Sequence, residues 1–301
     1  MNAAARSARN AFADLELDRL HAQRGDARWL EAAREDPSAR YLLSLPDAAL
    51  WATPGGDALQ WLAAADLPAA QRAQASLLGR DARGQLYYFH LAATTVPPGA
   101  GRAQPLRALA AAAGAFDAGL AAYAVALAHW QRHSRHCPAC GAPTLPADAG
   151  HRMRCTRCGH EQFPRTDPAV IVLVEHGDAA LLGRRPGWPA GRFSTLAGFV
   201  EPGETLEAAV RREIAEESGA EVIACEYHSS QPWPFPASLM LGFNARAASR
   251  RIHSGDGELA ELRWLSRAQL RAGLADASLH LPPSYSVAWH LIRDWLARVP
   301  T

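Results

Sequence analysis

Lysine is absent from this sequence of 301 residues, so arginine and some histidine supply its cationic side chains. The 31 basic residues are nearly balanced by 30 acidic ones, which leaves a formal net charge of +1. A chain with so little net charge has no overall field that would attract nucleic acid or a membrane surface. A charged ligand must therefore be recognised by a local group of residues.

A long uninterrupted apolar run is also missing. The first twenty residues include acids and no continuous apolar stretch, so they do not resemble a secretory signal, and we expect a cytoplasmic protein. Residues 108–130 are long enough to cross a bilayer, but they are mostly alanine, with Asp117 and Gly119 in the middle. We expect a buried or amphipathic helix of a soluble domain there, and no membrane span.

The length suffices for two domains and a small module, and the sequence divides into three zones. We expect an N-terminal α+β domain at residues 1–131, a cysteine-rich module at 132–166 and an α/β domain with a mixed sheet at 167–301. The first zone includes a strand-like run at 85–93. The third opens with two apolar runs joined by a His-Gly-Asp turn, which predicts a β-hairpin. A helix, strands at 221–229 and 238–247, and a last helix near 285–298 follow.

Four of the five cysteines form two Cys-x-x-Cys pairs, Cys137 with Cys140 and Cys155 with Cys158. Two such pairs can surround one tetrahedral zinc ion, and four thiolates leave no open position for chemistry. The spacing therefore predicts one structural Zn²⁺. The alternative, two disulfides, conflicts with a reducing compartment. Cys225 lies in an apolar run and is predicted to be a buried free thiol.

The cysteine module is locally basic, with arginines at 132, 135, 152, 154, 157 and 165 against Asp148 and Glu161. Such a surface could contact a phosphate-bearing partner, including RNA. It could equally be a solvated surface, which is the usual role of charge clusters.

Residues 198–220, GFVEPGETLEAAVRREIAEESGA, place Glu213, Glu216 and Glu217 near the end of a predicted helix that Gly219 caps. Acids there oppose the helix dipole, and the like charges of Glu213 and Glu217 cost about 0.2 to 0.5 kcal/mol. A hard divalent cation turns this repulsion into affinity, because Mg²⁺ prefers carboxylate oxygens together with substrate phosphate and water. The alternative is a solvated helix face on which these small energetic penalties are tolerated and no cation binds.

The same stretch resembles the Nudix signature at each fixed position: Gly198, Glu204, Arg212-Glu213-Ile214, Glu216-Glu217, Gly219 and Ala220. The resemblance implies a Nudix α/β/α sandwich and hydrolysis of a nucleoside diphosphate linked to another group. It also implies that Glu213 and Glu217 are the main ligands of a catalytic Mg²⁺ or Mn²⁺. By the same resemblance Glu216 is a further ligand or the base that activates water, the Ala197 carbonyl is a backbone ligand, and Glu204 and Arg212 brace the loop onto the helix.

Residues 230–238, SQPWPFPAS, follow the signature. Three prolines fix φ and stiffen the backbone, so Trp233 and Phe235 become rigid aromatic faces that suit a ligand with flat rings. Stacking of a base on such a face contributes about 1 to 3 kcal/mol. The alternative is a proline-rich surface loop or a peptide ligand for another domain.

This stretch and the cysteine module both resemble the NADH pyrophosphatase family of Nudix hydrolases, and residues 77–89 resemble its N-terminal domain, which is Nudix-like. The resemblance implies that Glu258 is another metal ligand and that Phe163 takes the place of a stacking aromatic, often tyrosine, whose hydroxyl is lost here. The family's N-terminal substrate lysine has no counterpart in this chain. The implied substrate-binding residues are Gln231, Pro232, Trp233, Pro234, Phe235, Pro236, Ala237, Ser238, Phe163, Arg107 and Ala288.

We therefore expect an enzyme that splits the pyrophosphate of NADH, and less readily of NAD⁺, into nicotinamide mononucleotide and AMP. The family resemblance also implies removal of NAD caps from RNA and a homodimer. Two alternatives stay open. One is a Nudix hydrolase of ADP-ribose or dinucleoside polyphosphates, and the other is a zinc-ribbon protein that binds RNA or dinucleotides without turnover.

Overall fold

The computed structural model describes residues 1–45, 47–91, 99, 101–253 and 257–298. These residues divide into two compact units. The C-terminal unit comprises Met1–Ala13, Asp167–Pro232 and the chain from Ser238 onward, and the N-terminal unit comprises Asp14–Thr166 and Trp233–Ala237. We describe each unit by itself.

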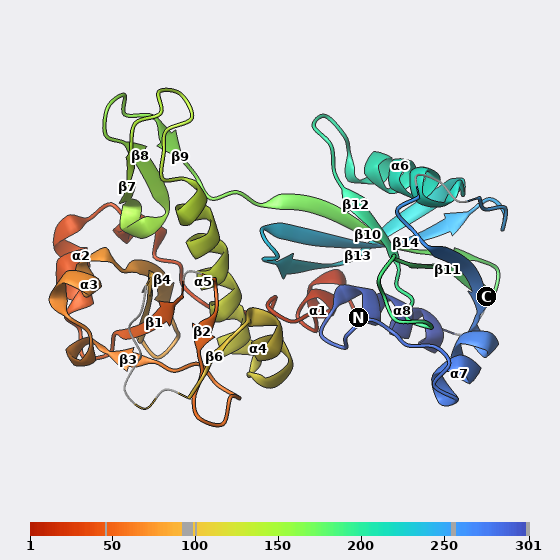
Figure 1. Cartoon of the computed structure of the whole chain (residues 1–301), viewed down its shortest axis with the longest axis horizontal. Coiled ribbons are helices and arrows are strands. Elements are labelled where there is room, and N and C mark those ends of the chain that lie inside the picture. Colours follow the sequence, from red (N-terminus) through yellow and green to blue (C-terminus); the bar gives the residue numbers. More distant parts are fainter. Residues whose placement is uncertain (46, 92–98, 100, 254–256, 299–301) are drawn as a thin grey trace. The chain divides into compact units, whose positions relative to one another are not determined.

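A mixed six-stranded sheet forms the centre of the C-terminal unit (Figure 1). Its strand order is β13-β14-β10-β11-β15, and β12 pairs with β10 off this path. Strand β10 runs parallel to β14 and antiparallel to β11 and β12, so the predicted mixed sheet and the predicted β10–β11 hairpin are confirmed. The strands are β10 (Asp167–His176), β11 (Ala179–Arg184), β12 (Leu196–Phe199), β13 (Val222–Trp233), β14 (Ser238–Ala247) and β15 (Glu261–Ser266).

Helices cover both faces of this sheet. Strand β10 reads as an unbroken apolar run because both of its faces are buried. Val170, Val172 and Val174 pack into a cluster with residues of α6 (Leu206–Ser218). Ile171 and Leu173 point the other way and pack with residues of α7 (Arg267–Ala275) and α8 (Val287–Ala297). The expected α/β/α sandwich is therefore confirmed.

The N-terminal unit contains a second mixed sheet of order β4-β5-β1-β2-β6, with β3 paired to β1. Tyr41 of β1 and Tyr88 of β5 stack at 5.0 Å between ring centroids within its core. The run predicted at 85–93 is β5 in its described part, and residues 92 and 93 lie outside the described residues. The strands are β1 (Arg40–Ser44), β2 (Leu50–Trp51), β3 (Leu62–Ala63), β4 (Ser76–Arg80), β5 (Leu86–Leu91) and β6 (Ala103–Gln104), and the helices are α2 (Ala27–Arg34), α3 (Ala69–Gln74), α4 (Leu106–Ala112) and α5 (Ala115–His133).

The single helix expected at residues 108–130 is instead the end of α4 and most of α5. Ala113 and Gly114 take extended ψ angles of 155° and 157°, which breaks the helical hydrogen-bond ladder between them. Among the described helices, none combines the length and hydropathy that crossing a bilayer requires.

The cysteine module is a three-stranded sheet of β7 (Thr144–Ala147), β8 (Arg152–Cys155) and β9 (Glu161–Gln162). It clusters with residues 14–131 in one compact unit, whereas residues 1–13, with helix α1 (Ala3–Ser7), cluster with the C-terminal unit. The domain boundaries at 131 and 166 stay predictions. Residues 1–13 belong to the C-terminal unit, whereas the rest of the first zone belongs to the N-terminal unit.

Candidate active site

Helix α6 presents the acidic residues of the signature. Thr205 caps its start by accepting a hydrogen bond from the Ala208 N–H at 3.2 Å. Gly219 ends it in the left-handed conformation, φ 66°, and a Cβ there would lie 1.9 Å from the ring of His253. The predicted glycine cap is confirmed, and the glutamates do lie in the last turns of the helix.

Arg212 holds the acids in place. Its Nε and Nη2 donate to the two oxygens of Glu204 at 2.7 and 2.8 Å, a bidentate pair that lowers the pKa of Glu204 to about 2. Its Nη1 donates to Glu213 and to Glu216, each at 2.9 Å. Its Nη2 also donates to the Phe199 carbonyl at 2.8 Å, so one guanidinium joins the loop, β12 and the helix. The predicted Glu204–Arg212 brace is confirmed.

The carboxyl of Glu213 lies against the backbone of β12. A Cβ built on Gly198 would come within 1.9 Å of that carboxyl, so glycine is required for this approach. Burial raises the pKa of Glu213, hydrogen bonding to Arg212 opposes the rise, and the charges of Glu216 and Glu258 add to it. Ala197 directly precedes Gly198 in the same strand. The structure thus brings Glu213, Glu258 and the Ala197–Gly198 backbone into one neighbourhood.

Glu217 is the most enclosed of the acids, with a relative exposure of 3%. Buried carboxylates of this kind supply the hard oxygen ligands that Mg²⁺ and Mn²⁺ prefer, and a bound cation would offset the cost of burying their charge. Among the described residues, however, the glutamates are not drawn into a group whose ligand atoms all lie within 4.8 Å, as the cysteines are. The set of Ala197, Glu213, Glu216, Glu217 and Glu258 therefore stays a prediction.

The four cysteines of the module fit one zinc ion. Sulfur–sulfur separations are 3.7 Å for Cys137–Cys158, 3.5 Å for Cys140–Cys155 and 3.6 Å for Cys140–Cys158. A tetrahedron with Zn–S distances of about 2.3 Å has edges of about 3.8 Å. The N–H groups of Cys158 and Arg157 donate to the sulfur of Cys155 and lower its pKa to about 6, which favours the thiolate that binds metal. Cys225 is only partly buried.

The aromatic pair and one predicted arginine meet in the N-terminal unit. The Arg107 guanidinium lies 3.8 Å from the ring centroid of Phe235 and 5.2 Å from that of Trp233. The two rings pack edge to face, with centroids 5.0 Å apart. Pro234, Pro236 and Ala237 form the turn between β13 and β14 with Phe235, and Ser238 begins β14. A cation stacked on aromatic faces, beside a stiff turn, can bind a flat ring and a phosphate.

Other predicted substrate residues lie in different surroundings. Gln231 is 0% exposed, and its side-chain amide is hydrogen-bonded to backbone groups. Ala288 lies in the first turn of α8 and is buried in the core, whereas Pro232 is partly exposed. Phe163 is 61% exposed, and the guanidinium of Arg152 lies 5.4 Å from its ring. The contact of each with substrate stays a prediction.

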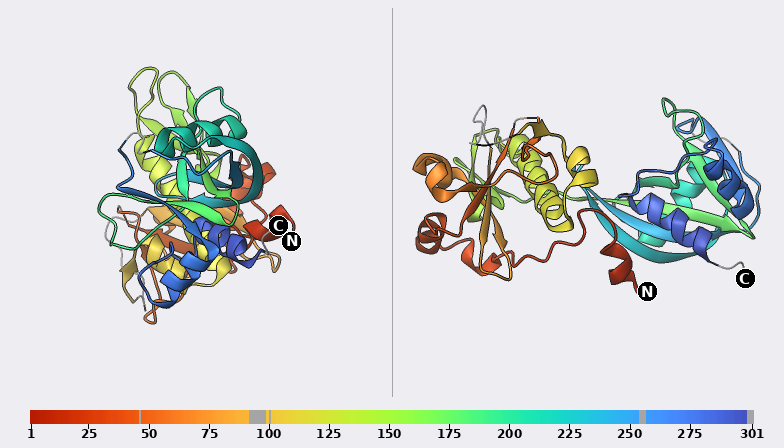
Figure 2. Two further views of the ribbon diagram at one scale, coloured as in Figure 1. Left: turned by 90° about the vertical axis from the view of Figure 1, so that its right-hand side faces the viewer. Right: turned by 90° about the horizontal axis from the view of Figure 1, so that it is seen from below.

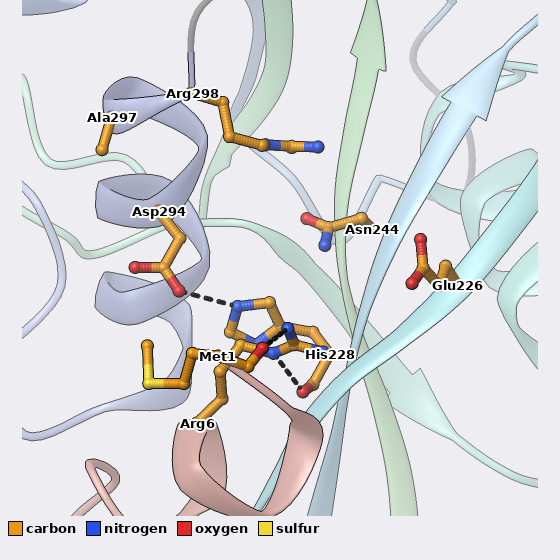
Figure 3. Close-up of a pocket in the computed structure, with 8 residues that line it drawn as sticks. All are labelled: Met1, Arg6, Glu226, His228, Asn244, Asp294, Ala297 and Arg298. Carbon is orange, nitrogen blue, oxygen red and sulfur yellow. Dashed lines mark hydrogen bonds and ion pairs between the residues drawn. The ribbon is translucent and has the colours of Figure 1, made fainter.

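A pocket of about 390 Å³ in the C-terminal unit lies elsewhere (Figure 3). It opens between α8 and strands β13 and β14, and none of the predicted site residues lines it. His228 in this pocket bonds Asp294 at 3.0 Å, and burial lowers the pKa of His228. Sequence reasoning missed this pair because no motif marks it and 66 positions separate its members.

Comparison with known families agrees with this geometry. A family model described as the NUDIX domain matches residues 164–286. This part of the chain is a Nudix domain. A second family model, the NADH pyrophosphatase zinc ribbon domain, matches residues 132–163, directly before the Nudix domain.

Two curated relatives are similar to part of the chain. An NAD-capped RNA hydrolase NudC of Mycobacterium bovis is 46% identical over 188 residues, 59% of this chain and 60% of that protein. The NudC of Pseudomonas aeruginosa is 46% identical over 176 residues, 58% of this chain and 60% of its own length. The match thus spans 60% of these relatives. The crystal structure of a Nudix hydrolase from Nitrosomonas europaea aligns with a TM-score of 0.42 and 24% identity, covering 55% of this chain and 89% of that one.

Proposed function

We propose that this protein hydrolyses the pyrophosphate bond of NADH, and less readily of NAD⁺, to nicotinamide mononucleotide and AMP. The observation that carries the proposal is the Arg212-braced set of glutamates on α6, in a Nudix domain that follows a zinc ribbon of the NADH pyrophosphatase type. The relatives named NAD-capped RNA hydrolases support the same substrate class.

The glutamates of the C-terminal unit would hold Mg²⁺ or Mn²⁺, with Glu213 and Glu217 as the main ligands and Glu216, Glu258 and the Ala197 carbonyl as further ones. When bound, the ion neutralises phosphate charge and lowers the pKa of a water molecule. Water adds to one phosphorus, the bridging P–O bond breaks, and two monoesters leave. Glu216, whose side chain is 52% exposed, is the acid best placed to accept a proton from water. Arg212 orients the carboxylates of Glu213 and Glu216 through its hydrogen bonds.

The aromatic faces of Trp233 and Phe235, with Arg107 stacked on them, would bind a flat ring of the dinucleotide together with its phosphate. Phe163 would add another stacking face from the zinc ribbon. The exposed arginines of the ribbon would contact the RNA body when the substrate is an NAD-capped transcript.

Two further proposals come with this function. The ribbon's four thiolates need a reducing compartment, which supports the cytoplasm. The family resemblance supports a homodimer, which light scattering of the purified protein would test. A mass of about 65 kDa supports the dimer, given 32.4 kDa per chain, whereas a monomer mass at micromolar concentration contradicts it.

A substrate panel tests the proposal. NADH, NAD⁺, NAD-capped RNA and ADP-ribose would be compared at matched concentration with Mg²⁺ and with Mn²⁺, and the products identified by mass spectrometry. We expect AMP from NADH, released faster than from ADP-ribose. Preference for ADP-ribose would support the alternative of a Nudix hydrolase that acts on ADP-ribose. Binding of NADH without release of AMP would support a protein that only recognises its ligand.

Substitution of the enclosed acid tests the site itself. Glu217→Gln removes the charge and keeps the shape, so we expect less than about a tenth of wild-type turnover with an unchanged unfolding midpoint. Glu207→Gln is the matched control, because Glu207 is an exposed glutamate in the first turn of the same helix. Comparable activity of Glu217→Gln and Glu207→Gln would contradict the assignment of Glu217 as a metal ligand.

A further inference from the structure

The first thirteen residues form a segment that is packed along the C-terminal unit. Arg9 donates to both carboxylate oxygens of Asp294 on α8. Arg6 donates to the His228 carbonyl at 2.8 Å, as Figure 3 shows. Helix α1 of this segment, in red, lies beside the blue α8 (Figure 2). The segment is therefore fixed at two points before the chain enters the N-terminal unit at Asp14.

The same segment covers the outer edge of β13. Strand β13 ends the sheet order, so its outer backbone groups have no neighbouring strand among the described residues. Asn10, 2% exposed, donates to the Ser230 carbonyl at 2.8 Å and to the Ser229 hydroxyl at 3.3 Å. The Ser230 N–H donates to the Ser7 hydroxyl at 3.0 Å. Both backbone groups of Ser230, one residue before the aromatic motif's glutamine, are thus taken by the N-terminal segment.

Gln231 joins this segment to the start of α8. Its Nε2 donates to the Ala11 carbonyl at 3.1 Å and to the Tyr285 carbonyl at 2.8 Å. Its Oε1 accepts from the Val287 N–H, at the first helical position of α8, at 2.8 Å. The Ala11 N–H also donates to the Tyr285 carbonyl, at 3.2 Å. Both amide hydrogens and the amide oxygen of a fully buried glutamine are therefore committed to backbone.

We propose that Gln231 and Asn10 are positioning residues for the substrate site, and that Gln231 acts without touching the substrate. Together they hold three chain segments: the N-terminal segment, the end of β13 that leads directly to Trp233, and the first turn of α8, which carries Ala288. Two of these segments bear predicted substrate residues. Loss of either amide lets the end of β13 move and weakens binding of the dinucleotide. This inference rests on the proposed hydrolysis of NADH.

Asn10→Ala is the decisive variant, because Asn10 lies outside the aromatic motif. Asn2→Ala is its matched control on the same segment, since the Asn2 side chain caps α1 locally by accepting from Ala5 N–H. We expect KM for NADH to rise about fivefold in Asn10→Ala and in Gln231→Leu, the equivalent of one buried hydrogen bond, with kcat changed less than twofold. The control keeps the wild-type values of both constants.

Hydrogen exchange supplies a readout that does not depend on turnover. In Asn10→Ala, amides of residues 229–231 and 286–288 should exchange faster than in Asn2→Ala, with the amides of α6 unchanged. If Asn10→Ala does not fold, Ser7→Ala removes the acceptor of the Ser230 N–H and replaces it in both measurements.

The outcomes separate the two proposals. If the wild-type protein releases no AMP from NADH, the proposed function is wrong. The hydrogen-exchange data still decide whether the N-terminal segment fixes β13. Equal exchange in Asn10→Ala and Asn2→Ala overturns the positioning role. A raised KM in Gln231→Leu alone, with Asn10→Ala like its control, makes Gln231 a direct substrate contact and also overturns it.

Discussion

Acid should loosen the attachment of the zinc ribbon through one histidine. His151 precedes β8, and its Nε2 donates to the Leu77 carbonyl of β4 at 2.7 Å, which ties the ribbon to the sheet of the N-terminal unit. Burial lowers the pKa of His151 to about 4, against the opposing effect of the Leu77 carbonyl. The charges of Arg24 and Arg19 lower it further, and that of Asp148 raises it.

The size of the effect follows from the two pKa values. The unfolded chain binds a proton at this ring near pH 6.5 and the folded protein only near pH 4, so stability is complete above 6.5 and falls as the pH drops towards 4. The difference of about 2.5 units corresponds to about 3.4 kcal/mol at the acid limit. Between pH 7.5 and pH 5.0 the expected loss from this group is about 2 kcal/mol.

Urea unfolding of the wild type and of His151→Gln at pH 7.5 and pH 5.0 measures this loss. Glutamine can still donate to the Leu77 carbonyl but does not titrate, so the variant should lose about 2 kcal/mol less than the wild type between the two pH values. The cysteine thiolates also gain protons in acid, but they do so in both proteins, and their contribution cancels. The same pH dependence in both proteins would refute the assignment.

Three further predictions concern the site and the ribbon. Arg212→Lys replaces the planar guanidinium, which donates to several carboxylates at once, by a compact ammonium group. We expect about 10- to 100-fold weaker Mn²⁺ binding, measured by titration calorimetry. Unchanged affinity would show that the brace does not orient the ligands. Phe235→Ala should raise KM for NADH about 5- to 150-fold, the equivalent of one lost stacking face, in steady-state assays, and an unchanged KM would exclude stacking on this ring. Cys140→Ser should reduce bound zinc, by elemental analysis, well below one per chain and lower the unfolding midpoint of the N-terminal unit; full zinc content would contradict the four-cysteine site.

Local signals in the sequence predicted the elements around the acidic helix well. Gly219 marked the end of α6, the two apolar runs marked β10 and β11, and the strand predicted at 238–247 is β14. Each of these depends on neighbouring residues alone, through a glycine cap or an apolar period. The predicted strand at 221–229 was too short, because β13 continues to Trp233 through Pro232. An edge strand tolerates a proline that a central strand would not.

Long-range contacts could not be predicted from those signals. Nothing near Asn10 in the sequence indicates that it bonds Ser230, because 220 positions separate them. The family resemblance placed Gln231 among the substrate-binding residues, and the structure commits its amide to three backbone groups. The sequence alone does not distinguish a glutamine that lines a pocket from a glutamine buried in the core. Only the packing around the residue separates the two roles.

The double-sided burial of β10 makes the position of the acids sensitive to purely apolar changes. Helix α6 rests on the even-numbered valines of that strand, and Gly198, which admits the Glu213 carboxyl, pairs with Val170. A smaller side chain at Val172 would let the helix sink towards the sheet and shift every carboxylate together, without altering one polar atom. The catalytic properties of this protein can therefore change through substitutions on the buried apolar face of α6, and not only through substitutions of charged residues.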